Sequence, residues 1–253
     1  MAIDSHMHAN SLVVSDLSKV ISHINDNPNI ESVINVGLNI ETSKQSIDIS
    51  RNNKKFYSAI GIHPLYIGDQ DIKSLYTLAQ EDKVVAIGEI GIDTINEESI
   101  TEQKKYLIQQ IRIANELGLP VIIHANNANR QIIEIFENYV KPEYGCVFHC
   151  FQPNLDDLKY IVDNGFYISF AGRITYKTAK RSIEVARAVP KELFIVETDS
   201  PYIPPEPLLR NDINESKHIK YIIQALSKAM EMSYEEVESL SSANTKRLFR
   251  KMR

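Results

Sequence analysis

The chain has 253 residues, of which 43 % are hydrophobic and 24 % are charged, and its formal net charge is −5. This composition excludes a disordered chain, and the negative charge argues against non-specific coating of nucleic acid, which needs many cationic contacts to phosphate. The length is typical of one closed α/β barrel, so we expect a single domain over residues 1–253.

The chain shows no sign of a membrane or secretory segment. No run of about 18 apolar residues exists, and the N-terminus enters a strand-like segment without a basic region and apolar signal core. The only cysteines, Cys146 and Cys150, lie in or beside the strand-like CVFHC, which is typical of reduced thiols rather than of a disulfide framework. We therefore expect a cytoplasmic protein with no membrane contact.

Apolar, β-branched segments alternate with amphipathic stretches along the chain. The stretches 15–26, 102–118 and 154–165 carry apolar residues at helical spacing, and 233–249 is expected to be a closing helix that covers the barrel. This alternation predicts a (β/α)8 TIM barrel, with an open doubly wound sheet as the alternative. The strand-like segments lie near 2–5, 31–37, 56–60, 83–88, 120–123, 145–148, 166–170 and 193–197.

Residue types that bind metal ions close most of these strand-like segments. Asp4, His6 and His8 alternate in the first segment, so we expect their side chains to share one face. The carboxyl ends of barrel strands meet at one rim, so the whole set should converge there, although any single histidine could instead be a hydrogen-bonded core residue. The residues that close later segments are His63, Glu89, His124, His149 and Asp199.

The donor types in this set indicate the chemistry. Imidazoles and carboxylates without thiolates suit Zn²⁺, Mn²⁺, Co²⁺ or Fe²⁺ better than Ca²⁺, while Mg²⁺ would keep more water. A catalytic ion leaves one position open, so this many donors predicts two divalent ions with Glu89 as the shared carboxylate. Such a pair lowers the pKa of a bound water, which favours hydrolysis.

The order of these motifs resembles the TatD-related metal-dependent deoxyribonucleases of the amidohydrolase superfamily, nearly from end to end. Gln103, Tyr106 and Gln109 also resemble a helix motif of that family. The motifs are Asp-x-His-x-His at 4–8, GIHP at 61–64, GEIGID at 88–93, PVIIH at 120–124, FHCF at 148–151, ETDSPY at 197–202, and Asn214 with Glu215.

The resemblance implies roles for the candidate residues. Asp199 would orient or deprotonate the attacking water, and Asp4 would hold the histidines of the first strand. His63 would face the scissile phosphate or the leaving group, with a hydrogen-bonded rim histidine as the alternative. Glu197 lies two residues before Asp199 and is expected either behind the metal ligands or as a buried structural carboxylate. The implied ligands are His6, His8, Glu89 and Asp199 for one ion, and Glu89, His124 and His149 for the other.

Several positions depart from the family pattern, and all concern the substrate. Asn126 replaces a usual arginine, Leu65 a frequent histidine, Thr94 an aromatic residue and Ser216 a usual proline. We expect the metal ligands to be intact and the substrate contacts to have changed. Candidate substrate contacts are Asn126, Arg173, Arg210 and Asn214, and a basic rim could add Lys177, Lys180, Arg181 and Lys217, for which a solvated helix face is the alternative.

Three functions follow from these features. The first is a two-metal phosphodiesterase that trims DNA, as a 3'-5' exonuclease on single-stranded or frayed ends. The second is a metal-dependent hydrolase of an ester or amide, on a small or tRNA-linked substrate; Glu89, in place of a bridging carbamylated lysine, argues against it. The third is a non-catalytic metal-binding partner in a larger assembly, against which the intact ligand set argues. The sequence leaves the oligomeric state open, a monomer included.

Overall fold

Eight parallel strands form one sheet in which each strand pairs with the next in chain order. The computed structural model describes residues 1–11, 13–95 and 99–252. The first strand forms a parallel bridge, from Met7 to Ser200, with the segment that follows the last strand, so the sheet curls into a nearly closed barrel. This order confirms the predicted TIM barrel and rules out the open sheet. The strands are β1 (Ala2–Met7), β2 (Ile30–Val36), β3 (Phe56–Ile60), β4 (Val84–Asp93), β5 (Val121–Asn126), β6 (Cys146–Phe148), β7 (Tyr167–Phe170) and β8 (Phe194–Val196).

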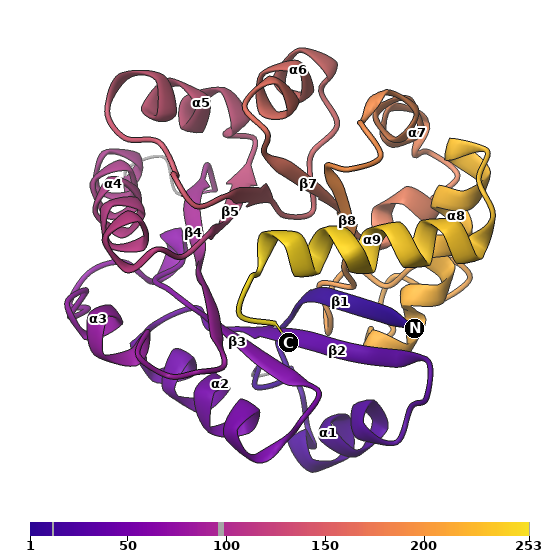
Figure 1. The fold of residues 1–253 in the computed structure, drawn as a ribbon, viewed down its shortest axis with the longest axis horizontal. Helices are drawn as coiled ribbons and strands as arrows, with labels where there is room; N and C mark the ends of the chain where they lie inside the picture. The colour runs from indigo at the N-terminus through magenta and orange to yellow at the C-terminus, as the bar shows by residue number, and fades with distance from the viewer. Residues whose placement is uncertain (12, 96–98, 253) are drawn as a thin grey trace.

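Helices surround the barrel on its outside, as Figure 1 shows. The stretches predicted as helices are confirmed with small shifts of their ends. Asn154 caps the beginning of α6, and left-handed Gly118 follows the end of α4. The helices are α1 (Leu17–Asn25), α2 (Ile40–Asn52), α3 (Ser74–Leu78), α4 (Ile100–Leu117), α5 (Asn129–Asn138), α6 (Leu155–Asp163), α7 (Lys180–Ala188), α8 (Ile219–Met230) and α9 (Tyr234–Leu248).

β4 and β5 extend beyond the predicted strands toward the rim of the barrel. The predicted segments end near residues 88 and 123, but the pairing continues from Ile90 with Ile123 to Asp93 with Asn126. A strand ends where its backbone loses its partner rather than where apolar residues stop, so the polar and glycine residues of 88–93 remain in the sheet. The longer strands carry the donors of Glu89 and His124 to the mouth.

The helix α9 closes the amino-terminal end of the barrel. It crosses that end in Figure 1 and contacts β1 and β8. Leu248, Phe249 and Met252 pack inside the barrel against residues from the beginnings of the strands, such as Ile3 and Val85. This apolar floor leaves the carboxyl ends of the strands, at the other end, for polar side chains. No helix in the described part of the chain is both long and apolar enough to cross a membrane.

Phe249→Ala should destabilise the protein without changing the side chains at the carboxyl ends of the strands. Phe249 is fully buried, so truncation removes apolar contacts and leaves a cavity. We expect the free energy of unfolding to fall by about 3–5 kcal/mol, measured by chemical denaturation. Tyr139→Ala is the matched control, because that ring is 70 % exposed; equal losses in the two variants would contradict this role of α9.

Candidate metal centre

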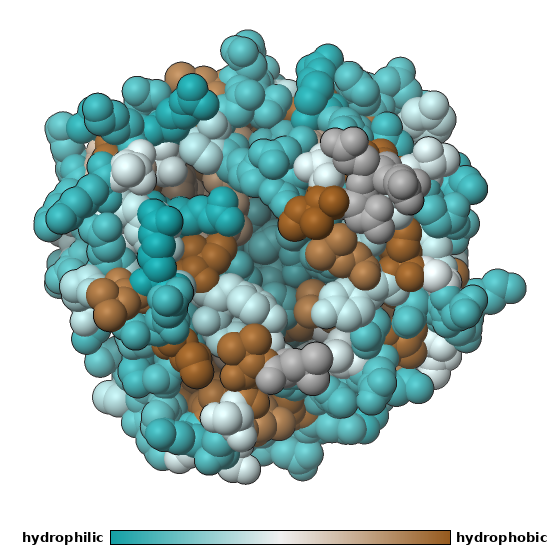
Figure 2. All heavy atoms as spheres, turned by 180° about the vertical axis from the view of Figure 1, so that it is seen from behind, coloured by the Kyte–Doolittle hydropathy of each residue, from teal (hydrophilic) through white to brown (hydrophobic). Residues whose placement is uncertain are grey.

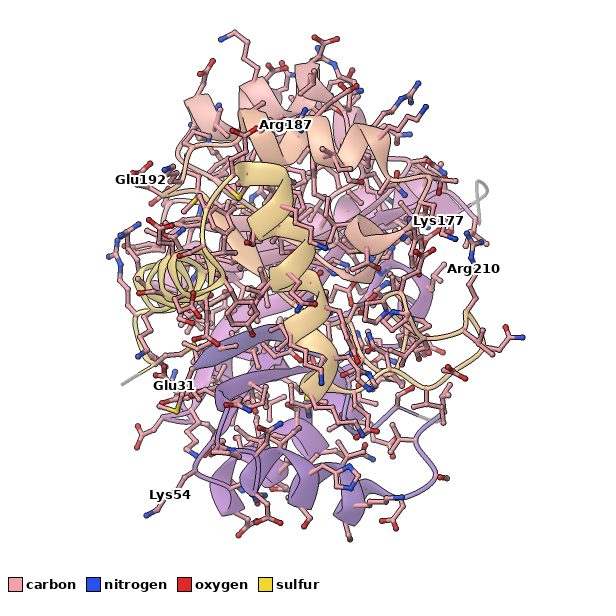
Figure 3. The ribbon with its side chains drawn as sticks, turned by 90° about the vertical axis from the view of Figure 1, so that its right-hand side faces the viewer. Glu31, Lys54, Lys177, Arg187, Glu192 and Arg210 are labelled. Atoms are coloured by element: carbon pink, nitrogen blue, oxygen red, sulfur yellow. The ribbon has the colours of Figure 1, made fainter. Side chains whose placement is uncertain are left out.

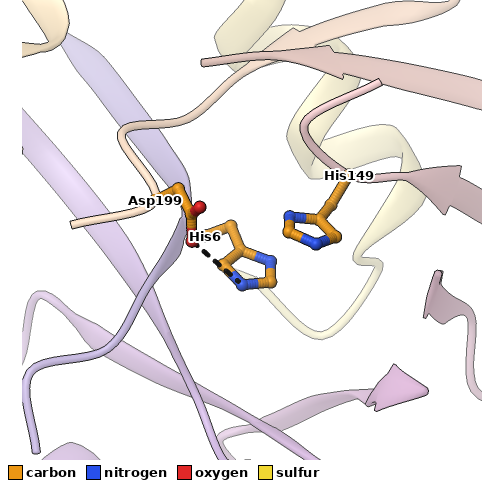
Figure 4. A group of neighbouring side chains, drawn as sticks. All are labelled: His6, His149 and Asp199. Carbon is orange, nitrogen blue, oxygen red and sulfur yellow. Dashed lines mark ion pairs between the residues drawn. The ribbon is translucent and has the colours of Figure 1, made fainter. Parts of the chain in front are cut away.

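His6, in β1, and His8, just after β1, lie side by side at the mouth of the barrel. Their Nε2 atoms are 3.1 Å apart and both side chains are buried. The ring of His6 also stacks on that of His149, with centroids 4.2 Å apart and planes 13° apart, and Figure 4 shows these two rings with Asp199. Strand ends that are far apart in the sequence therefore bring donors to one place, as the sequence predicts.

The Asp4 carboxylate contacts no imidazole nitrogen among the described residues, although it accepts the backbone N–H of His6 at 3.5 Å. The pairing of β1 with β2 is irregular between Asp4 and Met7. The Asp4 carboxylate accepts hydrogen bonds from the Thr198 hydroxyl at 2.6 Å, the Thr198 backbone N–H at 2.8 Å and the Ser216 hydroxyl at 2.6 Å. Asp4 thus anchors the segment after β8 rather than an imidazole nitrogen. Burial raises its pKa to about 7.

Glu89 lies at the centre of the cluster, and its two carboxylate oxygens face different histidines. Its side chain is buried, and β4 comes close to β5 at Gly91, where a Cβ atom would lie 1.8 Å from the carbonyl oxygen of His124. Only glycine permits this approach, which brings Glu89 next to His124. The distances are 2.5 Å to His124 Nδ1, 2.6 Å to His149 Nε2 and 3.7 Å to His63 Nε2 from Oε1, and 3.5 Å to His6 Nε2 and 3.7 Å to His8 Nε2 from Oε2.

Hydrogen bonds on the outer side of two rings indicate which nitrogen carries the proton. His8 Nδ1 lies 2.9 Å from the Val36 carbonyl oxygen, and His124 Nε2 lies 2.9 Å from Asp93 Oδ2. Carbonyl and carboxylate oxygens only accept, so in a neutral ring these nitrogens donate and the other nitrogen turns a lone pair to the centre. His149 Nδ1 forms no hydrogen bond with the described residues, but it lies at ion-pair distance, 3.4 Å, from Glu197 Oε1.

His63 has the opposite arrangement. Its Nδ1 accepts the backbone N–H of Leu65 at 3.1 Å, so the proton of the neutral ring is on Nε2, which faces Glu89. Burial lowers the pKa of His63 to about 3, which keeps the ring neutral. Although His63 lies within reach of a cation beside Glu89 and His124, its inner nitrogen is a hydrogen-bond donor rather than a lone pair.

Asp199 completes the cluster from the loop after β8. Its Oδ1 lies 3.6 Å from His8 Nε2 and 3.9 Å from His6 Nε2, and its backbone N–H donates to the His6 carbonyl oxygen at 2.9 Å. Its φ of 54° is in the left-handed region that non-glycine residues rarely adopt. The neighbouring segment is held by Asn214, whose amide donates to the carbonyl oxygens of Thr198 and Tyr202, both at 2.8 Å.

Asp93 is a site residue that the sequence analysis missed. Its carboxylate contacts the outer nitrogen of His124 and accepts a hydrogen bond from the Asn126 amide at 3.1 Å. These contacts hold its pKa down at about 2, although burial would raise it. The signal was present, because Glu89, Gly91 and Asp93 alternate on one strand, but the predicted strand ended before them.

The charges of the cluster are strongly coupled. Burial would raise the pKa of Glu89, but the surrounding rings, first that of His149, hold it well below its usual value. Burial would lower the pKa of His149, but Glu89 and then Glu197 raise it well above its usual value. Burial would also raise the pKa of Asp199, which the contact with His8 holds down. A divalent cation would stabilise the ionised carboxylates, as protonated histidine rings do in its absence. The cation would also compete with protons for the ring nitrogens.

The predicted substrate residues are not all at the mouth. Asn214 is buried, and its amide donates hydrogen bonds to backbone carbonyl oxygens. Asn126 lies between Asp93 and Gln152, and the Gln152 amide donates to it at 3.0 Å. The polar groups of both side chains are therefore engaged in contacts within the protein. Arg173 is exposed and lines a hollow together with Asn127 and Gln152. Arg210 lies over the Tyr176 ring, 5.2 Å from its centroid, and Figure 3 shows it with Lys177 on the side of the molecule away from α9.

The donor set suits borderline divalent metal ions. Three groups of side chains have donor atoms close enough together to hold a cation, and they consist of imidazole and carboxylate, the donors that such ions prefer. The buried Nδ1 of His6 has no hydrogen-bond partner among the described residues. The groups are His6 with His149 and Asp199, His6 with His8 and Glu89, and His63 with Glu89 and His124.

A (β/α)8 barrel with these donors at the carboxyl ends of its strands has the architecture of the metal-dependent hydrolases. The chain belongs to the TatD-related DNase family, whose model matches residues 3–250. It is 32 % identical to a protein of Bacillus subtilis named metal-dependent hydrolase YabD, over 99 % of both chains. It is 27 % identical to the 3'-5' ssDNA/RNA exonuclease TatD of Escherichia coli, over 87 % of this chain and 88 % of that one. The crystal structure of the Escherichia coli TatD homologue YjjV superposes with a TM-score of 0.90 at 24 % identity, covering 98 % of each chain.

Asp93→Asn should lower the pKa of His124 in the metal-free protein. Burial lowers the pKa of His124, and the carboxylates of Glu89 and Asp93 both raise it. The variant removes the carboxylate of Asp93, so the pKa should fall. The titration of the ring can be followed by NMR, with Asp48→Asn, a substitution at an exposed carboxylate, as the control. An unchanged or higher pKa in Asp93→Asn would show that the contact does not polarise the ring.

Proposed function

We propose that this protein is a two-metal phosphodiesterase that removes nucleotides from the 3' ends of single-stranded DNA. The division of donors around Glu89 carries this proposal. One of its oxygens faces His6 and His8, and the other faces His124 and His149. A carboxylate in that position suits a bridge between two ions. Asp93, Glu197, Glu89 and Asp199 are buried carboxylates, and two divalent ions would offset four negative charges.

The imidazole nitrogens that face Glu89 indicate which residues would hold each ion. His6, His8 and Asp199 would hold one ion with Glu89 Oε2, and His124 and His149 would hold the other with Glu89 Oε1. Zn²⁺, Mn²⁺, Co²⁺ and Fe²⁺ fit these donors, and Mg²⁺ would keep more water. When bound, such ions lower the pKa of water and offset charge on a phosphoryl group.

The remaining polar groups would orient and protonate the reactants. Asp199 accepts a proton from the attacking water, since contacts with histidines keep its carboxyl ionised. His63, neutral with its proton on Nε2, donates a hydrogen bond to a phosphate or leaving-group oxygen. Asp93 and Glu197 hold the rings of His124 and His149 in place from behind.

The surroundings of the mouth support a single strand as the substrate. Tyr66 and Tyr202 are 43 % and 40 % exposed, and their rings lie 6.0 Å from that of His63 and 5.9 Å from that of His8. Exposed aromatic rings on either side of a cluster can stack on unpaired bases. Figure 2 shows the face opposite α9, with a hydrophilic central hollow and hydrophobic side chains around it. Two relatives, from Shigella flexneri and Escherichia coli, are named 3'-5' ssDNA/RNA exonuclease TatD, which agrees with a single-stranded substrate.

The function can be tested with labelled single-stranded DNA, duplex DNA, a small phosphodiester and a carboxyl ester, each with added Mn²⁺ or Zn²⁺. We expect release of nucleotides from the single strand, and a loss of about 10²–10⁴-fold in Asp199→Asn, because the general base is removed. Asp82→Asn, at an exposed position, is the control. Turnover of the ester with intact DNA would replace this proposal with hydrolysis of another bond, and metal binding without any turnover would indicate a binding protein.

Glu89→Gln should lower the number of bound ions by about one, because an amide bridges two cations poorly. The stoichiometry can be measured by metal analysis after dialysis, with Gln80→Glu as the control that changes charge at an exposed position. Two ions retained with unchanged activity would disprove the bridge.

A further inference from the structure

A hollow of about 550 Å³ lies next to the proposed metal centre, over the loops that follow β5, β6 and β7. Each of the three loops contributes polar or cationic side chains to its wall, and α7 adds another. Residues of this wall include Asn127, Arg130, Gln152, Asn154, Arg173 and Arg181.

One wall of the hollow is connected to the centre by hydrogen bonds. Gln152 accepts the backbone N–H of Asn127 at 2.9 Å and donates to the Asn126 side chain at 3.0 Å. Asn126 in turn donates to Asp93, which contacts the ring of His124. The hollow and the donors therefore lie on opposite sides of one thin wall of side chains.

The hollow carries an excess of positive charge in a chain whose net charge is −5. Arg130, Arg173 and Arg181 line it, against the single acidic residue Asp157. Arg130 pairs with Glu134 at 3.6 Å, but Arg173 and Arg181 form no ion pair with any residue that the structure describes. Two guanidinium groups without acidic partners, facing one concave surface, favour an anion with several oxygens.

We propose that this hollow binds the phosphate adjacent to the scissile one in the nucleic acid strand, an inference that rests on the proposed function. The position at which relatives of this chain are expected to have an arginine is Asn126, whose amide is occupied by Asp93 and Gln152. Arg173, from the loop after β7, and Arg181, from α7, supply cations at this hollow. On this assignment a substrate with a single phosphate leaves them without a partner, and a substrate with two phosphates engages them.

The test compares a thymidine dinucleotide, which has one phosphodiester, with a trinucleotide, which has two. In Arg173→Ala/Arg181→Ala we expect KM for the trinucleotide to rise on the order of tenfold, while kcat, and both constants for the dinucleotide and the small phosphodiester, change less than about twofold. The matched control is Arg112→Ala/Arg250→Ala, which removes two exposed arginines outside the hollow.

A parallel binding measurement in the Asp199→Asn background keeps this proposal separate from the catalytic one. There the ratio of trinucleotide to dinucleotide Kd should rise about tenfold in the double variant, whether or not the wild type turns over either substrate. An equal loss for both oligonucleotides, an equal loss in the control variant, or no loss at all would overturn the assignment of the hollow. Failure of the wild type to hydrolyse any phosphodiester would instead overturn the proposed function.

Discussion

The burial of the Glu89 carboxylate is the constraint on which the site depends. An ionised group removed from water is stable only with compensating charge or hydrogen bonds, and here five imidazole nitrogens lie within 3.7 Å of its two oxygens. The rings cannot move away without leaving this charge uncompensated, and outer contacts such as His8 with Val36 and His124 with Asp93 fix their orientation. The cluster is therefore pre-organised by the protein.

Much of the fold and of the cluster could be predicted from the sequence, because the strands are continuous apolar segments and the donors follow them directly. Where the backbone is irregular, prediction fails. The pairing of β1 is irregular after Asp4, whose carboxylate binds Thr198 and Ser216, and no local pattern in the sequence marks these contacts. Asn214 contacts the segment after β8 through hydrogen bonds that depend on the folded loop. Asp93 could have been found from its alternation with Glu89.

Asn126, beside the metal-type donors, forms hydrogen bonds only within the protein in the described structure. Asn126, which replaces an expected arginine, is part of a chain of hydrogen bonds from Asp93 to Gln152. That chain supports the His124 ring, so the Asn126 side chain has a structural role here. The nearby cations lie in the loop after β7 and on α5 and α7, outside the motifs that carry the metal-type donors, so motif analysis describes the donors better than the surroundings of the hollow.

The hydrogen bonds between β1 and the segment after β8 have a consequence for folding. Here the His6 carbonyl oxygen accepts the Asp199 N–H at 2.9 Å and the His8 N–H donates to Ser200 at 2.7 Å, so residues almost two hundred positions apart are adjacent. Forming such long-range contacts is entropically costly and slow. An ion held by His6, His8 and Asp199 would connect the two edges of the sheet. The free energy of unfolding would therefore rise with the concentration of free metal ion.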